Sequence, residues 1–153
     1  MDSLRKGMDK VGRKQRPELL SQQVTGARYF FLNLAPTRGA RVGPALGGRE
    51  LCNPDYRIIR ATYAYDGLEY VAEGAGWVEL DGRRHPLGSG AVFAYGRATR
   101  CEIQTDPARP LVKYFVCLTG GAATKRLARA GVAPGTRSEE HTSELQSPCN
   151  PVC

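Results

Sequence analysis

Turn-forming residues interrupt this chain at short intervals, and this feature constrains the fold more than any other. The 153 residues include 18 glycines and 10 prolines, and short runs of apolar and aromatic residues lie between them. Strand-like runs separated by turn signals are typical of β-sandwiches and β-barrels. No long helical pattern precedes residue 121. The sequence therefore predicts one mainly β domain.

We expect eight strands from residue 28 onward. They cover Arg28–Leu34, Arg57–Tyr65, Leu68–Glu73, Gly76–Leu80, Arg84–Leu87, Ala91–Tyr95, Arg100–Gln104 and Val112–Leu118. The pair Asp81-Gly82 predicts a tight hairpin turn, because these residues accept the positive φ angles that such a turn requires. Pro107 and Pro110 predict a loop, since proline lacks the amide donor that strand pairing uses.

The pattern changes after residue 121, where apolar residues recur at helical spacing up to residue 130. This spacing predicts a short helix with a basic outer face, which Gly131 ends as a C-terminal cap. Apolar residues occupy both faces of the strand Val112–Leu118. One face of that strand is expected to pack inside the barrel and the other against the helix.

The positive charge is distributed unevenly. The net charge is +7, and residues 1–16 contribute +4 of it, from six basic and two acidic residues. This basic segment lacks the apolar stretch of a secretory signal, and no apolar run approaches the roughly 18 residues of a membrane span. We expect a cytoplasmic protein in which residues 1–23 form a mobile basic arm. Nucleic-acid binding by the domain itself is a hypothesis that rests on net charge alone.

Cysteine and histidine give little support for a metal site. The five cysteines show no C-x-x-C spacing, and an odd number cannot all pair within one chain, so reduced and mostly buried thiols are expected. His85 is the one histidine before residue 137, and a lone imidazole is a poor metal site. Neither a phosphate-binding loop nor a catalytic triad can be nominated. No cofactor is predicted.

Polar and aromatic residues on the strands are candidates for a small-molecule pocket. Tyrosine rings can stack on a sugar and offer hydroxyl groups to it. Arg60, if it points inward, has a fixed fork of donors that suits a polyol or a carboxylate. Glu69 requires a partner if it is buried. Trp77 shares the strand parity of Glu79 and is expected to face outward.

Residues 68–93, with the sequence LEYVAEGAGWVELDGRRHPLGSGAVF, resemble the cupin-type sensor domain of AraC-family transcriptional regulators. The similarity extends over roughly residues 24–134, and Ser89-Gly90 stands where the family usually has Pro-Gly. The resemblance implies a cupin-like double-stranded β-helix, a jelly-roll barrel, over residues 24–136, followed by a short C-terminal helix. It also implies a small effector, often a sugar, a homodimer, and promoter DNA bound through a C-terminal helix-turn-helix domain.

The resemblance favours a regulatory domain over an enzyme. Enzymatic cupins hold a metal through H-x-H…E and a later histidine, and these regions read YDGLE (65–69) and TRC (99–101) here. A metal-free effector pocket is therefore predicted, with Arg60, Tyr70, Tyr95 and Tyr114 as its ligand-binding residues. Effector binding is expected to close the barrel and to change how a dimer presents its DNA-binding domain. The alternative is a stand-alone small cupin enzyme that acts on a sugar or a small acid.

The segment RSEEHTSELQS (137–147) is similar, over all eleven residues, to the translation of a common short-read sequencing adapter. The resemblance implies that the natural reading frame is lost at about Thr136 and that residues 137–153 are a non-native tail. We therefore expect the DNA-binding domain to be missing from this chain.

Overall fold

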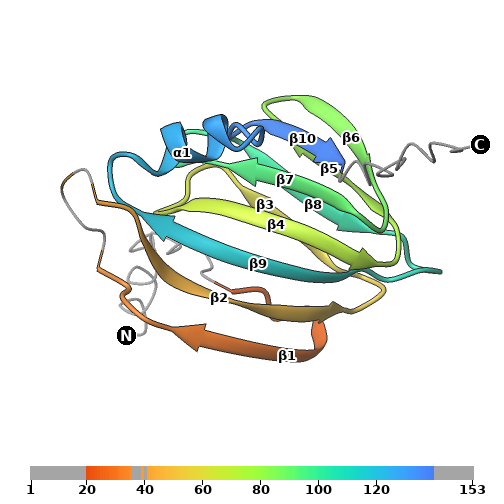
Figure 1. The fold of residues 1–153 in the computed structure, drawn as a ribbon. Coiled ribbons are helices and arrows are strands. Elements are labelled where there is room, and N and C mark those ends of the chain that lie inside the picture. Colours follow the sequence, from red (N-terminus) through yellow and green to blue (C-terminus); the bar gives the residue numbers. More distant parts are fainter. Residues whose placement is uncertain (1–19, 36–38, 40, 140–153) are drawn as a thin grey trace, which may run out of the picture.

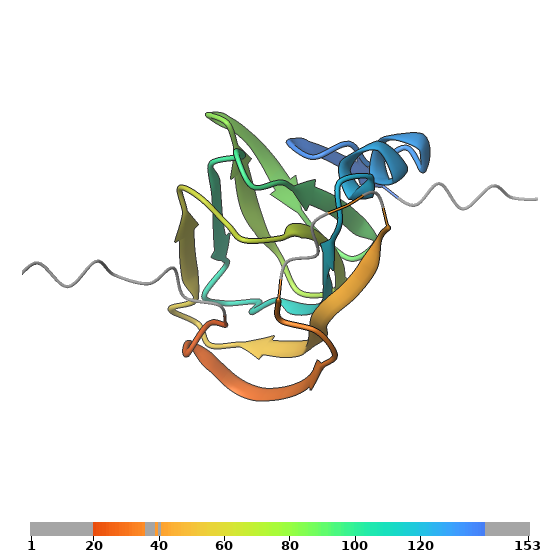
Figure 2. The same cartoon turned by 90° about the vertical axis from the view of Figure 1, so that its left-hand side faces the viewer.

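The computed structural model describes residues 20–35, 39 and 41–139, and they form two facing antiparallel sheets (Figures 1 and 2). The larger sheet has the spatial order β1 (Val24–Phe31), β2 (Gly43–Cys52), β9 (Val112–Thr119), β4 (Asp66–Glu73), β7 (Ala91–Tyr95) and β10 (Thr136–Glu139). The smaller sheet has the order β3 (Arg57–Arg60), β8 (Cys101–Thr105), β5 (Gly76–Leu80) and β6 (Arg83–Leu87). The mainly β, cupin-like fold expected from the sequence is confirmed.

The β5–β6 hairpin shows how local sequence determines this architecture. Asp81 and Gly82 have φ angles of 48° and 80°, and Leu80 pairs with Arg83 across the two-residue turn. Positive φ at both central residues matches the twist of the flanking strands. Val78 and Leu80 are buried, whereas Trp77 lies on the other side of β5, with the Arg84 guanidinium 3.7 Å from its ring. Both the turn and the outward direction of Trp77 are confirmed.

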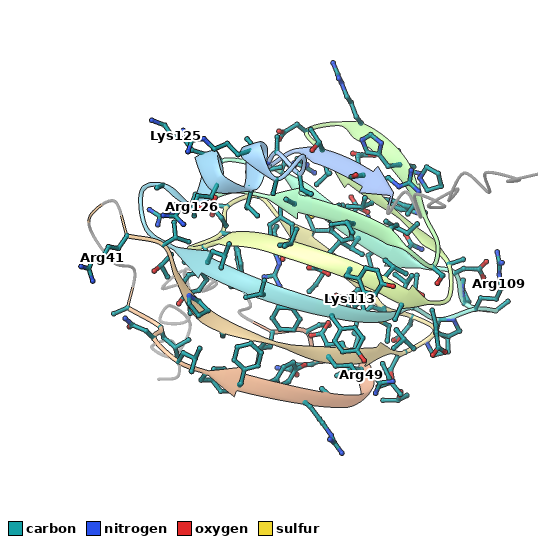
Figure 3. All side chains as sticks on the ribbon, in the orientation of Figure 1. Arg41, Arg49, Arg109, Lys113, Lys125 and Arg126 are labelled. Atoms are coloured by element: carbon teal, nitrogen blue, oxygen red, sulfur yellow. The ribbon has the colours of Figure 1, made fainter. Side chains whose placement is uncertain are left out.

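Helix α1 (Ala123–Arg129) lies at one end of the larger sheet, as Figure 1 shows. Its C-terminus is closed by two backbone hydrogen bonds, from Gly131 to the Ala128 carbonyl and from Val132 to the Leu127 carbonyl. With φ of 83° at Gly131, this arrangement is a Schellman cap, as the sequence predicts. Lys125 and Arg126 point away from the barrel (Figure 3). No helix in the described ranges is long and apolar enough to cross a membrane.

Strand β2 is the largest element that the sequence prediction missed. Its ten residues include three glycines and a proline, which usually indicate a loop. The structure gives these glycines a packing role: a side chain on Gly47 would meet the ring of Phe30 and the carbonyl oxygen of Phe115. Because the glycines of β2 have no side chains, the aromatic side chains of β1 can pack on the backbone of β2.

Two other strand boundaries differ from the prediction. The expected strand Arg57–Tyr65 ends at Arg60, because the chain then crosses from the smaller sheet to β4 in the larger one. The expected strand Arg28–Leu34 is shifted and runs from Val24 to Phe31. The remaining predicted strands match the observed ones to within two residues.

The two ends of the described chain also depart from expectation. Leu20 packs against the core and the Gln23 side chain accepts a hydrogen bond of 2.9 Å from the Arg57 amide, so residues 20–23 belong to the barrel; residues 1–19 lie outside the described residues. Thr136–Glu139 pair with β7, although residues from 137 onward are expected to belong to a non-native tail. Backbone groups make this pairing, and any extended segment can supply them to a sheet edge.

Candidate functional site

Three charged side chains meet inside the barrel. The Lys113 ammonium lies 2.6 Å from Glu50 Oε2 and 2.8 Å from Glu69 Oε2, and each of the three side chains is only 3% exposed. Lys113 comes from β9, which pairs with β2 on one side and β4 on the other, so the two carboxylates reach it from neighbouring strands. Burying ions in this way requires close pairing, because each loses its hydration.

Two tyrosine hydroxyls extend this charged cluster. Tyr29 on β1 donates to Glu50 Oε1 at 3.0 Å, and Tyr95 on β7 donates to Glu69 Oε1 at 2.8 Å. Each carboxylate therefore accepts a hydrogen bond from a tyrosine hydroxyl and forms an ion pair with Lys113, and the cluster spans five neighbouring strands of the larger sheet. Such shared hydrogen bonding is what makes buried charges tolerable.

Arg60 approaches the cluster from the smaller sheet. It is the last residue of β3, it is 8% exposed, and its guanidinium carbon lies 4.3 Å from the centre of the Tyr63 ring. The guanidinium donors of Arg60 thus point into the barrel. The rings of Tyr63 and Tyr95 lie there with their centres 5.6 Å apart.

A small polar cavity lies between these groups. Its volume is about 10 Å³, and its lining consists of Glu50, Arg60, Tyr63, Glu69, Tyr95, Lys113 and Phe115. This is roughly the space that one water molecule needs. In the conformation described, the cavity is therefore closed to a sugar-sized molecule.

Burial and neighbouring charges set the protonation of the site. Burial alone would lower the pKa of Lys113, but the Glu69 and Glu50 carboxylates outweigh it and hold that pKa well above its ordinary value. Burial, together with the Glu50 charge, raises the pKa of Tyr29 to about 12. Burial and the Glu69 charge likewise raise the pKa of Tyr95 well above 10. At neutral pH the site therefore presents an ammonium group and neutral hydroxyl donors.

The thiols near the barrel interior are protonated as well. Cys52, Cys101 and Cys117 are buried and unpaired, as the sequence predicts. Cys117 Sγ lies 3.2 Å from the Tyr63 hydroxyl, and burial raises its pKa to about 11. A protonated thiol is a poor nucleophile. Among the described residues no group of three histidine, cysteine or acidic side chains is placed to hold a metal ion.

The four predicted binding residues fall into two separate places. Arg60 and Tyr95 line the cavity. Tyr70 and Tyr114 lie directly opposite each other on β4 and β9, one residue away from inward-facing Glu69 and Lys113, so their side chains occupy the outer face of the larger sheet. There the two rings are 6.5 Å apart, and Tyr114 is 47% exposed. The structure does not bring the four residues into one pocket.

The packing of the outer face of β9 differs from the prediction. Helix α1 was expected to cover that face, but Tyr114 remains exposed and Val116 half-buried. The helix instead buries Ala123 and Leu127 at one end of the sheet.

Sequence reasoning missed two central residues of the cluster. Glu50 lies on β2, which was not expected to be a strand, and Lys113 looked like the polar position of an otherwise apolar strand. Glu69 was singled out as needing a partner if buried, and its partners are Lys113 and Tyr95. The available signal was the parity of β9, because Lys113 shares its strand face with Phe115 and Cys117, which turn inward.

The model of the family described as the AraC-like ligand binding domain matches residues 43–149, well over half of the chain. The chain belongs to this family. The match covers β2 through β10, and therefore every residue that lines the cavity of this AraC-like domain. Curated proteins gave no match.

Solved structures support the fold of the AraC-like domain. The plu4264 protein from Photorhabdus luminescens is 12% identical, with a TM-score of 0.51 and coverage of 85% of this chain and 99% of that one. The cupin domain of Cnp3 from Schizosaccharomyces pombe is also 12% identical, with a TM-score of 0.51 and coverage of 74% of each chain. YhaK from Escherichia coli matches with 12% identity and a TM-score of 0.50, over 64% of this chain and 46% of that one. At such identities the likeness shows a cupin-like fold alone.

Proposed function

We propose that this AraC-like domain senses a small, neutral, hydroxyl-rich effector such as a sugar, which binds among the charged groups inside the barrel. The observation that carries the proposal is the buried cluster of Lys113, Glu50 and Glu69 beside a polar cavity. Buried ion pairs contribute little stability compared with a packed apolar core. Convergent polar groups around a cavity are typical of ligand sites.

The charge balance of the site favours a neutral effector. Lys113 and Arg60 carry two positive charges, and Glu50 and Glu69 carry two negative charges, so the four buried groups sum to zero. A charged ligand would add an uncompensated charge to this low-dielectric interior. A polyol offers both donors and acceptors, and its C–H faces can lie against the rings of Tyr63 and Phe115, which line the cavity.

Effector binding requires the barrel to leave its closed state. A cavity of about 10 Å³ cannot accept a sugar, so the side chains around it must separate when the effector enters. We propose that the effector selects this more open state and that a homodimer transmits the change to a DNA-binding domain of the full-length regulator. The unpaired cysteines Cys52, Cys101 and Cys117 fit a cytoplasmic location.

Binding without turnover is the expected activity. Lys113 is held in its ammonium form, and a nucleophilic lysine must be neutral. The buried Cys117 is protonated for the same kind of reason, so neither group is activated for covalent catalysis.

The test is calorimetric titration of the 153-residue chain with neutral sugars, sugar acids and amino sugars. Saturable binding of a neutral sugar, without chemical change of the sugar, is the expected result. Tyr95→Phe removes a hydroxyl beside the cavity and should weaken that binding about five- to tenfold, whereas Tyr114→Phe on the outer face should leave it unchanged. Binding confined to charged ligands, or equal loss in both variants, would contradict the proposal.

A further inference from the structure

The inner face of β1 carries an aromatic side chain that is exposed to solvent. Side chains alternate between the two faces of a strand, and Tyr29 turns inward to bond Glu50, so Phe31 belongs to the same inner face. Phe31 is nevertheless 52% exposed, although Leu46, its cross-strand neighbour on β2, is fully buried. At Phe31 the apolar lining of the barrel therefore reaches the surface.

Aromatic rings connect Phe31 to the polar cavity. The centre of the Phe31 ring lies 6.4 Å from that of the Tyr29 ring, which lies 6.1 Å from that of Phe115. Phe115 lines the cavity, and so does Glu50, which accepts the Tyr29 hydroxyl. Gly48 separates Tyr29 from Phe115 across β2, and a side chain at Gly48 would collide with the Tyr29 ring. The rings of Phe115, Tyr29 and Phe31 thus form an aromatic row from the cavity wall to the surface.

The outer end of the aromatic row differs chemically from the cavity. On the inner face, Phe31 has Tyr29 as its neighbour along β1 and Leu46 as its neighbour across to β2. The Tyr29 hydroxyl is bound to Glu50, so these two neighbours present mainly apolar surface to a molecule lying on Phe31. Further sugar hydroxyls placed here would lose water without gaining side-chain partners, whereas an apolar group would gain from burial. The row therefore suits an apolar ring.

We propose that the effector is an aryl glycoside, with a neutral sugar that binds among the charged groups and an aromatic substituent that lies along the aromatic row. The inference rests on the proposed function and names the chemical class of the effector at the same site. A ligand of this kind matches both parts of the site, because hydroxyl groups meet the carboxylates and cations, and a ring meets rings. Aromatic rings attract one another in stacked and edge-to-face arrangements at the spacing seen along the row.

The aromatic row is available while the cavity is closed. The cavity of about 10 Å³ must widen before a sugar can enter, but Phe31 is exposed in the conformation described. An aromatic group can therefore lie on Phe31 before the charged groups separate. It follows that phenol alone should bind weakly at the row, without any sugar attached.

Calorimetric titration of the 153-residue chain with matched methyl and phenyl β-D-glycosides of glucose, galactose and xylose tests the proposal. The phenyl glycoside is expected to bind about tenfold more tightly than the methyl glycoside of the same sugar, because its ring buries additional apolar area. Phe31→Ala should reduce this preference to about threefold or less and should leave the affinity for the methyl glycoside unchanged. Equal affinities of the unaltered chain for the two glycosides would overturn the proposal.

Phe30→Ala is the matched control. Phe30 is the preceding residue and is 46% exposed, but its ring lies over Gly47, on the outer face of the sheet. This variant should keep the full preference for the phenyl glycoside. Loss of the preference in both variants, or equal weakening of both glycosides by Phe31→Ala, would show that these residues act only through the structure of β1 and would overturn the inference.

Magnetic resonance of the aromatic side chains in the unaltered chain gives a second test, which does not depend on a variant folding. Phenol at millimolar concentration should shift the ring signals of Phe31 and Tyr29 and leave those of Phe30 in place. Phenol that leaves Phe31 unmoved, or that shifts Phe30 equally, would contradict the proposal.

The inference and the proposed function fail in different ways. A methyl glycoside that binds as tightly as its phenyl counterpart removes the aromatic substituent and leaves the sugar site intact. Phenol that binds at Phe31, with no binding of any sugar or glycoside, removes the sugar site itself and with it the glycoside.

Discussion

The two faces of the β4–β9 pair depart from the usual distribution of polarity in an antiparallel sheet. The inner face carries Glu69 and Lys113, which are buried and charged, whereas the outer face carries Tyr70, Tyr114 and Val116, which are partly exposed and not charged. One-sided sheets ordinarily bury the apolar face and solvate the polar one. We propose that this arrangement serves the recognition of a polar ligand rather than maximal stability.

Replacing Lys113 should destabilise the protein more than any other substitution on the inner face. Lys113→Met leaves Glu50 and Glu69 buried without their cation and is expected to lower the free energy of unfolding by about 3–5 kcal/mol. Urea denaturation followed by circular dichroism measures the change.

The control for that variant removes the charges together. Lys113→Met combined with Glu50→Gln leaves Arg60 and Glu69 as buried groups of opposite charge and should recover much of the lost stability. A loss below about 1 kcal/mol in Lys113→Met would show that the carboxylates do not depend on this lysine.

Two carboxylates of one strand sharpen the comparison. Glu69 is buried between Lys113 and Tyr95, whereas Glu73 at the end of β4 is exposed. Glu69→Gln should lower the free energy of unfolding by about 1–3 kcal/mol, because it removes the charge that holds the ammonium. Glu73→Gln should change it by no more than about 0.5 kcal/mol. Equal changes of the free energy of unfolding in denaturant titrations would indicate that both side chains are exposed to water, which would contradict the burial of Glu69.

The third carboxylate of β4 should respond in the opposite direction. The Asp66 side chain points to the outer face of β4, as its position along the strand requires. There it is buried beneath α1 and accepts a 3.2 Å hydrogen bond from the Thr124 hydroxyl. Burial raises its pKa, although the Thr124 hydrogen bond opposes the shift. A raised pKa in the folded state means that the protonated form is favoured by folding, and this contribution is lost as pH rises through that pKa.

Asp66→Asn should therefore stabilise the protein slightly at neutral pH. The advantage should vanish as the pH falls below the raised pKa of Asp66, because the wild-type side chain is then neutral too. Urea midpoints of both proteins, measured across this range, check the prediction. A variant that is less stable at every pH would show that the Asp66 charge supports α1.

The sequence predicts best those parts of the fold that local chemistry controls. The Asp81-Gly82 turn determines the register of the β5–β6 hairpin, and the cap at Gly131 determines the end of α1. Strand β2 could not be recognised, because its glycines are explained only by the aromatic rings of β1 that lie over them. Such packing between distant segments leaves no local signature.

The site was predictable only in part for a similar reason. Arg60 and Tyr95 were proposed as binding residues and line the cavity, and their role in binding stays a prediction. Lys113 was missed because solvent-facing lysines are the common case, and its burial depends on Glu50 and Glu69 from two other strands. The ion pairs between neighbouring strands, rather than the residue types alone, explain why Lys113, Glu50 and Glu69 point inward.

The most direct test of the account is nitrogen-15 magnetic resonance of the Lys113 side chain in the full chain. The buried ammonium should give a protected signal at neutral pH, because its protons are held by Glu50 and Glu69 and exchange slowly with water. Addition of a neutral sugar that binds should shift that signal, and Lys113→Met should abolish it. No protected lysine ammonium, or a bound sugar that leaves the signal unmoved, would contradict the claim that this cluster recognises the effector.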